Sequence, residues 1–511
     1  MRRIALSCAL VLFACGGDTT NGNDAGADVS VQDVTQDTSN KDVVANDVAP
    51  DAPDPCASAP TTTFYVNAAS GNDANKGSGP ACAFKTISAA LTASNSAPNA
   101  TINVAAGSYG AGETFPLVVN KGRSLVGAGA SSTTIQGSSS TYNTTGTQSL
   151  LDTGTHFVTI LAGDAMGGTN SLGATTISGF TILPASSVTT PTANYMGLVC
   201  IAGNAPNTGT QPPAPAANLV LKSLTVGPNF DTAVAIGSSP TQQLGCNASI
   251  TVSTFAAANV GVLTGACGGA NPSQSWPSST IGSGQTADTN TFTGTAIGVF
   301  GGGCGSIQSI NTNKFTSGYR GIVLISAAAQ YFEILGNTFD GATAPAMGIG
   351  IHTNATATIA KLADNTFANI SESNAADTAA GTTTGFALAL GGGNVLQARR
   401  NSIHDNDNGI YLAGTVASGF DFSSGGQAAD ANKLYCNSKA VGNGYDLALA
   451  FTSNAAANFG GNAWDHAAPS TSVSLTTSAN GTDIVTGTSA GATTTGYGAA
   501  ITTACATNRS H

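Results

Sequence analysis

Charged side chains are scarce in this chain. They make up 8% of its 511 residues, whereas about a quarter of a typical soluble domain is charged. Only 16 residues are lysine or arginine, and the net charge is −11 at pH 7. A protein that binds nucleic acid needs a basic face to meet the phosphates. We therefore expect no nucleic-acid partner.

Metal-binding and redox motifs are also missing. No two cysteines form a CxxC pair, and the histidines show no metal-ligand spacing, which argues against thiol-redox and zinc chemistry. The apolar run from Ile4 to Phe13 is too short to cross a membrane. It follows Arg2 and Arg3, so residues 1–14 are predicted to be a secretory signal peptide.

The end of this run carries a short motif. Leu12-Phe13-Ala14-Cys15, followed by two glycines, resembles the lipobox of bacterial lipoproteins. The resemblance implies cleavage before Cys15, which becomes the lipidated N-terminus and ties the protein to a membrane. By analogy with these lipoproteins, the absence of an aspartate beside Cys15 implies the outer membrane, on its periplasmic side or at the cell surface. The alternative is an ordinary secretory signal that happens to contain Cys15.

The segment 15–60 is acidic and nearly free of large apolar side chains. Nine aspartates from Asp18 to Asp54 are opposed only by Lys41, so the segment has a net charge of −8. Low hydrophobicity combined with high net charge is typical of disorder. We therefore predict a disordered tether between the lipid and the folded body.

Eight cysteines remain once Cys8 of the leader and Cys15 are set aside. An even number in an exported protein favours disulfide bonds. Their positions leave the pairing open, and joining neighbours in the sequence is the simplest arrangement. It pairs Cys56 with Cys82, Cys200 with Cys246, Cys267 with Cys304, and Cys436 with Cys505.

A repeat dominates the second half of the chain. Seven times an asparagine stands two residues before a bulky apolar residue, at intervals of roughly 23–36 residues. The pairs are Asn290/Phe292, Asn313/Phe315, Asn337/Phe339, Asn365/Phe367, Asn401/Ile403, Asn432/Leu434 and Asn462/Trp464. Repeats of this length mark a solenoid, in which each repeat buries its apolar face only by stacking on its neighbours.

Aligning the repeats on the asparagine sorts the flanking residues into columns. Apolar residues stand three before it (Ile310, Ile334, Leu362, Ala398) and two after it (Phe315, Phe339, Phe367, Ile403), and polar residues stand four before it (Ser309, Glu333, Lys361, Gln397). Strand alternation predicts that the apolar columns point inward and the polar column outward. The asparagine should stand at a corner, where it satisfies backbone groups, tolerates a left-handed conformation and stacks on its neighbours.

The opening unit carries a more specific resemblance. Its motifs are Tyr65-Val66-Asn67, Gly71-Asn72-Asp73, Phe84-Lys85-Thr86-Ile87, Ile102-Asn103-Val104 and Ser124-Leu125-Val126. They resemble the domain of unknown function 1565 (DUF1565), which opens right-handed parallel β-helices of the pectin lyase-like superfamily. The resemblance implies an all-β, single-stranded right-handed parallel β-helix. A cap and first coil would occupy 61–137, further coils 138–505, and a tail 506–511.

The residue pattern of the opening unit predicts its elements. Apolar residues at helical spacing indicate a short helix from Phe84 to Ser94. Strands are expected at 64–66, 101–105, 114–119 and 124–126. The helix would cover the open end of the solenoid, where exposed strands otherwise invite pairing with other chains. We expect a monomer.

Ionisable residues concentrate between Lys314 and Asp407, so a catalytic site is expected in this stretch if the protein has one. Polysaccharide lyases and hydrolases on this fold need paired carboxylates, or calcium with a Lys or Arg base. The candidates are Lys361 or Arg400 as base and Asp364, Asp405 and Asp407 as metal or sugar ligands, with Arg399 alongside. No cofactor is expected otherwise. The Asp405-Asn406-Asp407 segment begins like a calcium loop, yet it lacks the later carboxylate of an EF-hand.

A structural role explains the same residues. The alignment places Glu333 beside Lys361 and Asp364 beside Arg400, one coil apart. Exposed ion pairs of this kind contribute about 0–1 kcal/mol each. The residues therefore leave the question of catalysis open and favour its absence.

Two functions remain. The favoured one is a membrane-anchored, surface- or envelope-displayed lipoprotein that serves as a non-catalytic binding or structural module for carbohydrate or envelope partners. Tyr319, Tyr411 and Tyr445 are candidates for an exposed sugar-stacking platform. The alternative is a polysaccharide lyase or glycoside hydrolase of unrecognised type, with its site on the 314–407 outer face. The carbohydrate partner is implied by the superfamily resemblance.

Overall fold

The structure is a computed structural model. It describes residues 56–139, 142–143, 155–163, 173–192, 194–201, 218–237, 246–256, 258–264, 279–303, 307–326, 331–344, 346–354, 357–371, 385–391, 394–414, 420–437, 444–451, 457–466, 468–472, 482–486, 492–493, 500–503 and 505. The predictions for the signal peptide, for Cys15, for the tether up to residue 55 and for the 506–511 tail lie outside these residues. So do Cys267 and Cys304.

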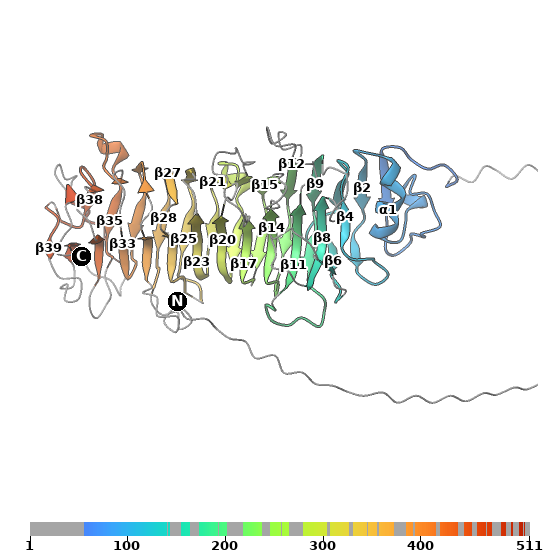
Figure 1. Ribbon diagram of the computed structural model, residues 1–511, viewed down its shortest axis with the longest axis horizontal. Coiled ribbons are helices and arrows are strands. Elements are labelled where there is room, and N and C mark those ends of the chain that lie inside the picture. Colours follow the sequence, from blue (N-terminus) through green and yellow to red (C-terminus); the bar gives the residue numbers. More distant parts are fainter. Residues whose placement is uncertain are drawn as a thin grey trace, which may run out of the picture. The chain divides into compact units, whose positions relative to one another are not determined.

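Short parallel strands stack into three long sheets, as expected for a parallel β-helix (Figure 1). The first sheet contains β1 (Thr63–Val66), β2 (Thr101–Val104), β5 (Ser124–Gly127), β9 (Ala174–Ser178), β12 (Asn218–Lys222), β15 (Asn247–Thr251), β18 (Ser279–Ile281), β21 (Ile307–Asn311), β24 (Tyr331–Leu335), β27 (Thr358–Ala363), β30 (Asn394–Val395) and β31 (Ala398–Arg399). The second contains β3 (Gly107–Tyr109), β6 (Thr133–Gln136), β10 (Thr181–Leu183), β13 (Thr225–Val226), β16 (Thr254–Ala256), β19 (Thr291–Thr293), β22 (Lys314–Phe315), β25 (Thr338–Asp340), β28 (Thr366–Ala368), β32 (Ser402–His404), β35 (Lys433–Tyr435) and β38 (Ala463–Trp464).

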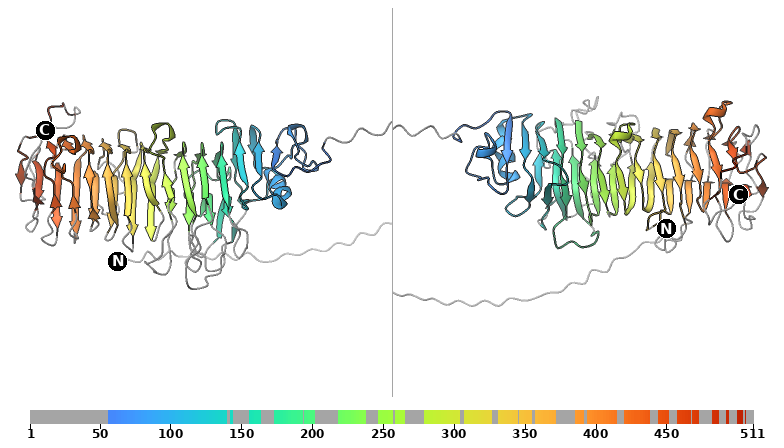
Figure 2. Two further views of the ribbon diagram at one scale, coloured as in Figure 1. Left: turned by 90° about the horizontal axis from the view of Figure 1, so that it is seen from above. Right: turned by 180° about the vertical axis from the view of Figure 1, so that it is seen from behind.

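The third sheet is the longest. It contains β4 (Leu117–Val119), β8 (Thr155–Gly163), β11 (Tyr195–Ile201), β14 (Thr232–Gly237), β17 (Val260–Thr264), β20 (Thr295–Gly303), β23 (Gly318–Ser326), β26 (Ile349–Asn354), β29 (Phe386–Gly391), β33 (Asn408–Gly414), β36 (Tyr445–Phe451), β40 (Thr482–Thr486) and β39 (Thr471–Ser472), and β7 (Tyr142–Asn143) pairs with β8 in antiparallel fashion. A small sheet joins β34 (Phe420–Asp421), β37 (Ala457–Asn458) and β41 (Ala492–Thr493). Within each long sheet, a strand pairs with its counterpart in the next coil (Figure 2).

The columns predicted from the repeat are confirmed. Ile310, Ile334 and Leu362 are fully buried in the first sheet, and Glu333 pairs in register with Lys361 on its outer side. In the second sheet the phenylalanines form one stack of rings. Its members are Phe255, Phe292, Phe315, Phe339 and Phe367, with ring centroids 4.5 to 4.9 Å apart.

Small residues in the third sheet make room for these rings. A Cβ placed on Gly298 would lie 2.7 Å from the ring of Phe315, and one on Gly321 would lie 2.6 Å from the ring of Phe339. Both distances are shorter than any real carbon contact, so a side chain at either position would displace the ring. The phenylalanine column therefore depends on a glycine column in another sheet.

The asparagines form a continuous hydrogen-bonded ladder at the corner between the first and second sheets. From Asn290 to Asn462, Nδ2 of each donates to Oδ1 of the next at 2.8 to 3.2 Å. The left-handed backbone falls on the preceding residue rather than on the asparagine. Thr312, Asp364 and Arg400, for example, have φ of 57°, 59° and 57°. At each of these turns the residue before the asparagine takes the left-handed conformation and is at least partly exposed, whereas the asparagine itself is buried.

The N-terminal end carries the expected helix, α1 (Ile87–Ala93), capped by the Thr86 side chain. The Glu113 carboxylate accepts hydrogen bonds from the backbone N–H groups of Ile87 and Ser88, both at 2.8 Å. At the C-terminal end of α1, the buried Arg123 side chain donates to the carbonyl of Leu91. A carboxylate at a helix N-terminus and a cation at its C-terminus both suit the orientation of the peptide dipoles.

One strand of the opening unit begins later than expected. The sequence pattern predicted a strand over 114–119, whereas β4 begins at Leu117. The preceding residues are held by the helix instead, because Thr114 donates its N–H to Ser88 Oγ at 2.8 Å and Glu113 caps the helix. The short strands β3 and β6 were not predicted.

Three of the expected disulfide bonds are present. Cys56 pairs with Cys82, Cys200 with Cys246, and Cys436 with Cys505. Each joins neighbours in the sequence order of cysteines, as the simplest arrangement proposed. In the described part of the chain, no helix has the length and apolar character needed to span a membrane.

Candidate functional site

One exposed corner of the β-helix brings together two of the six predicted site residues, Asp364 and Arg400, with Asp430, which was not predicted. Arg400 donates from Nε and Nη2 to Asp364 at 2.7 and 2.8 Å, and from Nη1 to Asp430 at 2.6 Å. These hydrogen bonds raise the pKa of Arg400 above its already high usual value. Loss of its proton becomes still less favourable, which argues against Arg400 as a general base.

Arg399 faces a different set of groups. Its guanidinium is nearly buried and bonds the carboxylate of Asp421, a residue of β34 in the small sheet, at 2.6 Å. Partial burial alone would raise the pKa of Asp421, but the hydrogen bonds from Arg399 and Ser423 outweigh it and lower that pKa. This pair is an internal contact of the coil.

Asp405 and Asp407 lie at the next corner, between the second and third sheets. Asp405 has a left-handed backbone (φ 55°), and its Oδ2 lies 2.8 Å from His404 Nδ1. The side chain of Asp407 is buried. The five-residue path from Arg400 to Asp405 runs along β32, a span of roughly 15 Å in extended chain. The structure therefore brings Asp364 and Arg400 together, and holds Asp405 and Asp407 apart from them.

Lys361 occupies a third location. It lies on the outer side of β27, where the register sets it beside Glu333 of β24. Among the described contacts, no ion pair joins the two side chains. Thus the six candidates from Lys361 to Asp407 are distributed over one sheet face and two corners.

The outer face of the third sheet carries apolar and aromatic side chains that the repeat pattern does not predict. At one end a separate apolar cluster consists of Val158, Leu161, Met196, Val199 and Ala235. Toward the other end Phe386 lies 5.1 Å from Tyr411 and 6.3 Å from Tyr445. Two of the three tyrosines proposed as an exposed sugar platform, Tyr411 and Tyr445, share this cluster. Tyr411 is partly accessible, whereas Tyr445 is buried and does not fit the expected platform.

Arg320 and His352 lie on strands between these two clusters. Arg320 Nη1 is 3.3 Å from His352 Nδ1, on the neighbouring strands β23 and β26. A guanidinium has only donors, so Nδ1 must accept and the imidazole proton resides on Nε2. Both side chains are partly accessible. Tyr319, the third candidate, precedes Arg320 in the same strand.

Sequence reasoning missed a group of acidic residues near the last coils. Asp446, Asp465 and Asp483 each place a carboxylate oxygen within 4.8 Å of the others. Strand alternation around the inward Leu447 suggests an exposed Asp446, yet Asp446 is 2% exposed. The only available signal was the register of the third sheet, which requires the pairing of strands far apart in sequence.

A comparison with protein families supports the DUF1565 resemblance of the opening unit. Residues 69–207 match the model of the family described as "Protein of unknown function (DUF1565)". The match includes the quoted motifs from Gly71-Asn72-Asp73 onward and begins after Tyr65-Val66-Asn67. It extends past residue 137, the predicted end of the cap and first coil. No curated protein matches the sequence.

Solved structures of low identity match this chain over much of its length. The A-module of mannuronan C-5 epimerase AlgE6 from Azotobacter vinelandii is 14% identical, with 81% of this chain and 94% of that chain covered and a TM-score of 0.44. The GH136 lacto-N-biosidase from Eubacterium ramulus is 11% identical, with 85% and 68% covered and a TM-score of 0.43. The catalytic unit of the GH87 α-1,3-glucanase from Streptomyces thermodiastaticus is 11% identical, with 79% and 65% covered and a TM-score of 0.37. The fold assignment itself stands on the strand order of the three sheets.

Proposed function

We propose that this chain is an outer-membrane lipoprotein whose β-helix is a non-catalytic binding module for polysaccharide or other envelope partners. Cys15 would carry the lipid, and the acidic segment after it would separate the body from the membrane. The three disulfide bonds support export to an oxidising compartment, because such bonds are rare in the cytosol.

The observation that carries the proposal is the dispersal of the charged candidates. A hydrolase needs two carboxyl groups about 5–10 Å apart across one sugar. Here Asp364 is engaged with Arg400 at one corner. At the other corner Asp407 is buried and Asp405 is engaged with His404. Arg400 also bonds Asp430. These contacts support a structural role for the corner charges.

The outer face of the third sheet supports the binding role. It combines the partly accessible ring of Tyr411, which packs against buried Phe386, with the donors of Arg320 and the Nε2–H of His352. Ligand sites commonly join an apolar lining to a few polar groups of this kind. We assign the binding surface to the face that carries Arg320, His352 and Tyr411.

Binding can be measured on the full chain with the Cys15→Ser substitution, which removes the lipid. Affinity electrophoresis against a panel of acidic and neutral polysaccharides should retard the protein in at least one gel. Arg320→Ala and Tyr411→Ala should each weaken that retardation by about tenfold, as for central residues of an interface. Arg400→Ala is the matched control, because it removes an arginine from the corner and should leave binding within about twofold of wild type.

The same panel tests the alternative. Reducing-sugar release and absorbance at 235 nm would report hydrolysis and elimination. Turnover that disappears in Arg400→Ala or Lys361→Ala would refute a non-catalytic module. Retention of full binding in both Arg320→Ala and Tyr411→Ala would refute the assigned face.

A further inference from the structure

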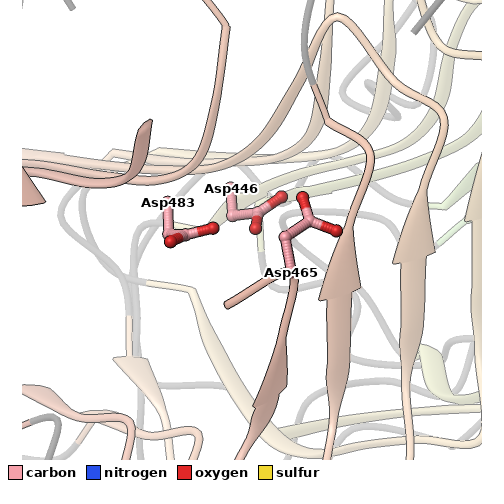
Figure 3. A group of neighbouring side chains, drawn as sticks. All are labelled: Asp446, Asp465 and Asp483. Atoms are coloured by element: carbon pink, nitrogen blue, oxygen red, sulfur yellow. The ribbon is translucent and has the colours of Figure 1, made fainter. Parts of the chain in front are cut away.

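Three aspartates converge near the last coils of the β-helix. Asp446 lies in β36, Asp483 lies in β40, and Asp465 directly follows β38. A carboxylate oxygen from each lies within 4.8 Å of those of the other two. Asp446 is 2% exposed and Asp483 is 1% exposed. The three carboxyl groups gather at one point (Figure 3).

Packing does not call for acidic residues at these positions. The pairing of β36 with β40 joins Tyr445 to Thr482 and Leu447 to Ile484, which sets Asp446 beside Asp483. In earlier coils the register gives this position to small residues: Gly197, Ala233, Gly261, Gly298, Gly321, Gly350, Ala387 and Gly409. Like charges opposite each other on neighbouring strands destabilise a sheet. The change from small residues to two aspartates therefore needs an explanation other than packing.

The hydrogen bonds around the cluster leave one oxygen unsatisfied. Asp483 accepts from the backbone N–H and the hydroxyl of Ser470 and lies 2.9 Å from His466 Nδ1. Asp446 Oδ1 accepts from Asn437 Nδ2 at 2.7 Å. Asp446 Oδ2 is buried and has no hydrogen-bond partner among the residues that the structure describes. A buried carboxylate oxygen is costly unless it is paired or bound to a metal.

The charges of the three carboxyl groups also favour a bound cation. Burial raises the pKa of Asp446 well above its ordinary value, and the charges of Asp465 and Asp483 raise it further. Two neighbouring carboxylates thus oppose ionisation of the third. A bound cation would reverse that effect, because it attracts all three carboxylates.

We propose that Asp446, Asp465 and Asp483 bind one calcium ion that joins the last coils of the β-helix. The donor set consists of carboxylate oxygens, which hard cations prefer. Calcium lies about 2.3–2.6 Å from its ligands, so opposed ligand atoms are up to about 5 Å apart, whereas the shorter bonds of magnesium allow only about 4 Å. The three oxygens lie within 4.8 Å of one another, a separation that the ligands of one calcium ion can have. Water can complete the coordination from the side of Asp465, which is partly exposed.

The ion would connect strands from two sheets. Asp446 and Asp483 belong to the third sheet, and Asp465 extends the second. Asp465 also accepts the backbone N–H of Cys436 at 2.9 Å, and Cys436 is joined to Cys505. Ion and disulfide together would close the C-terminal coils, in the way that α1 covers the opposite end.

Calcium binding can be measured by titration calorimetry on the full chain with Cys15→Ser, after treatment with a chelator. The chain that keeps Asp446, Asp465 and Asp483 should bind one calcium ion, and added calcium should raise its melting temperature. Asp446→Asn keeps the shape of the side chain and should weaken calcium binding by at least about tenfold. Asp465→Asn, at a less buried position, should do the same and serves if the first variant fails to fold. Asp340→Asn removes a carboxylate from the distant strand β25 and should leave calcium affinity unchanged.

The possible outcomes separate clearly. Loss of binding in Asp446→Asn or Asp465→Asn, with binding kept in Asp340→Asn, would support the site. A wild-type chain that binds no calcium, or variants that bind it as tightly as wild type, would overturn the proposal. Magnesium binding as tight as calcium binding would overturn the assignment of the ion. The binding-module proposal is untouched by either result, because its face lies around Arg320.

Discussion

Arg400 and Asp364 meet edge to edge across two adjacent coils, with Nε on Oδ1 at 2.7 Å and Nη2 on Oδ2 at 2.8 Å. The two-pronged contact has good geometry, yet 40% of the Arg400 side chain and 51% of the Asp364 side chain are exposed. Water therefore screens the pair. We therefore expect the pair to orient the side chains at the corner and to add little to the free energy of unfolding.

Removing this pair should change stability little. We expect Arg400→Ala to lower the free energy of unfolding by about 1 kcal/mol or less, since exposed pairs rarely contribute more. Urea unfolding of Arg400→Ala, Asp364→Asn and the double variant would give the coupling between them. A coupling energy above about 2 kcal/mol would show that the corner behaves as a buried site.

Removing one member of the asparagine ladder should cost much more. Asn365 accepts from the N–H and Nδ2 of Asn337, and donates to Asn401 and to the carbonyl of Ile334. Asn365→Ala leaves several of these buried groups without partners, so we expect a loss of about 2–4 kcal/mol in urea unfolding. The control is Asn259→Ala, whose hydrogen bond to Asp231 is exposed. Equal losses in the two variants would contradict a structural ladder.

The glycine column offers a steric test. In Gly298→Ala the new Cβ would lie 2.6 Å from the carbonyl oxygen of Gly321 and 2.7 Å from the ring of Phe315. We expect a destabilisation of about 1–3 kcal/mol or more, by thermal or urea unfolding. Gly79→Ala is the matched control, because a Cβ at Gly79 meets nothing within 4 Å. That variant should lie within about 0.5 kcal/mol of wild type.

The Arg399–Asp421 pair should contribute to acid sensitivity. The pKa of Asp421 is lower in the folded protein than in the unfolded chain, so the folded state disfavours its protonation. Its contribution is present above the unfolded pKa of about 3.9 and is lost as pH falls through the lower folded pKa. Urea midpoints measured from pH 7 to pH 2 should show Asp421→Asn less stable than wild type at neutral pH. The two proteins should converge at the acid end, and a difference that grows there would reverse the sign.

The lipid anchor has a direct test in the cell. Cys15→Ser should move the protein from the membrane fraction to the soluble fraction, because the acylated cysteine would be its attachment. Metabolic labelling with a palmitate analogue should mark the wild type alone. A variant that stays with the membrane would mean that something other than Cys15 holds it there.

The sequence sufficed for the parts of the fold that repeat locally. The asparagine and its flanking apolar residues recur within a few positions of each other, so Ile310, Asn313 and Phe315 could be assigned to a wall and a corner directly. The ion pair of Asp364 with Arg400 followed from the same alignment, because it depends only on stacking consecutive repeats.

What depends on long-range register could not be predicted. The convergence of Asp446, Asp465 and Asp483 needs the relative placement of three strands in two sheets. The glycine column is invisible without the rings of Phe315 and Phe339 beside it. The start of β4 at Leu117 depended on a contact with a helix whose ends were not known.

The asparagine ladder also makes the coil stack electrically directional. Every amide from Asn290 to Asn432 turns its NH2 group toward the next coil and its oxygen toward the previous one. Side-chain amide dipoles that point one way add together, as peptide dipoles do in a helix. A shorter ladder at the neighbouring corner runs the same way, from Asn406 through Asn437 to the carboxylate of Asp446. The C-terminal end of each column is thus its positive pole, and acidic side chains are best accommodated there.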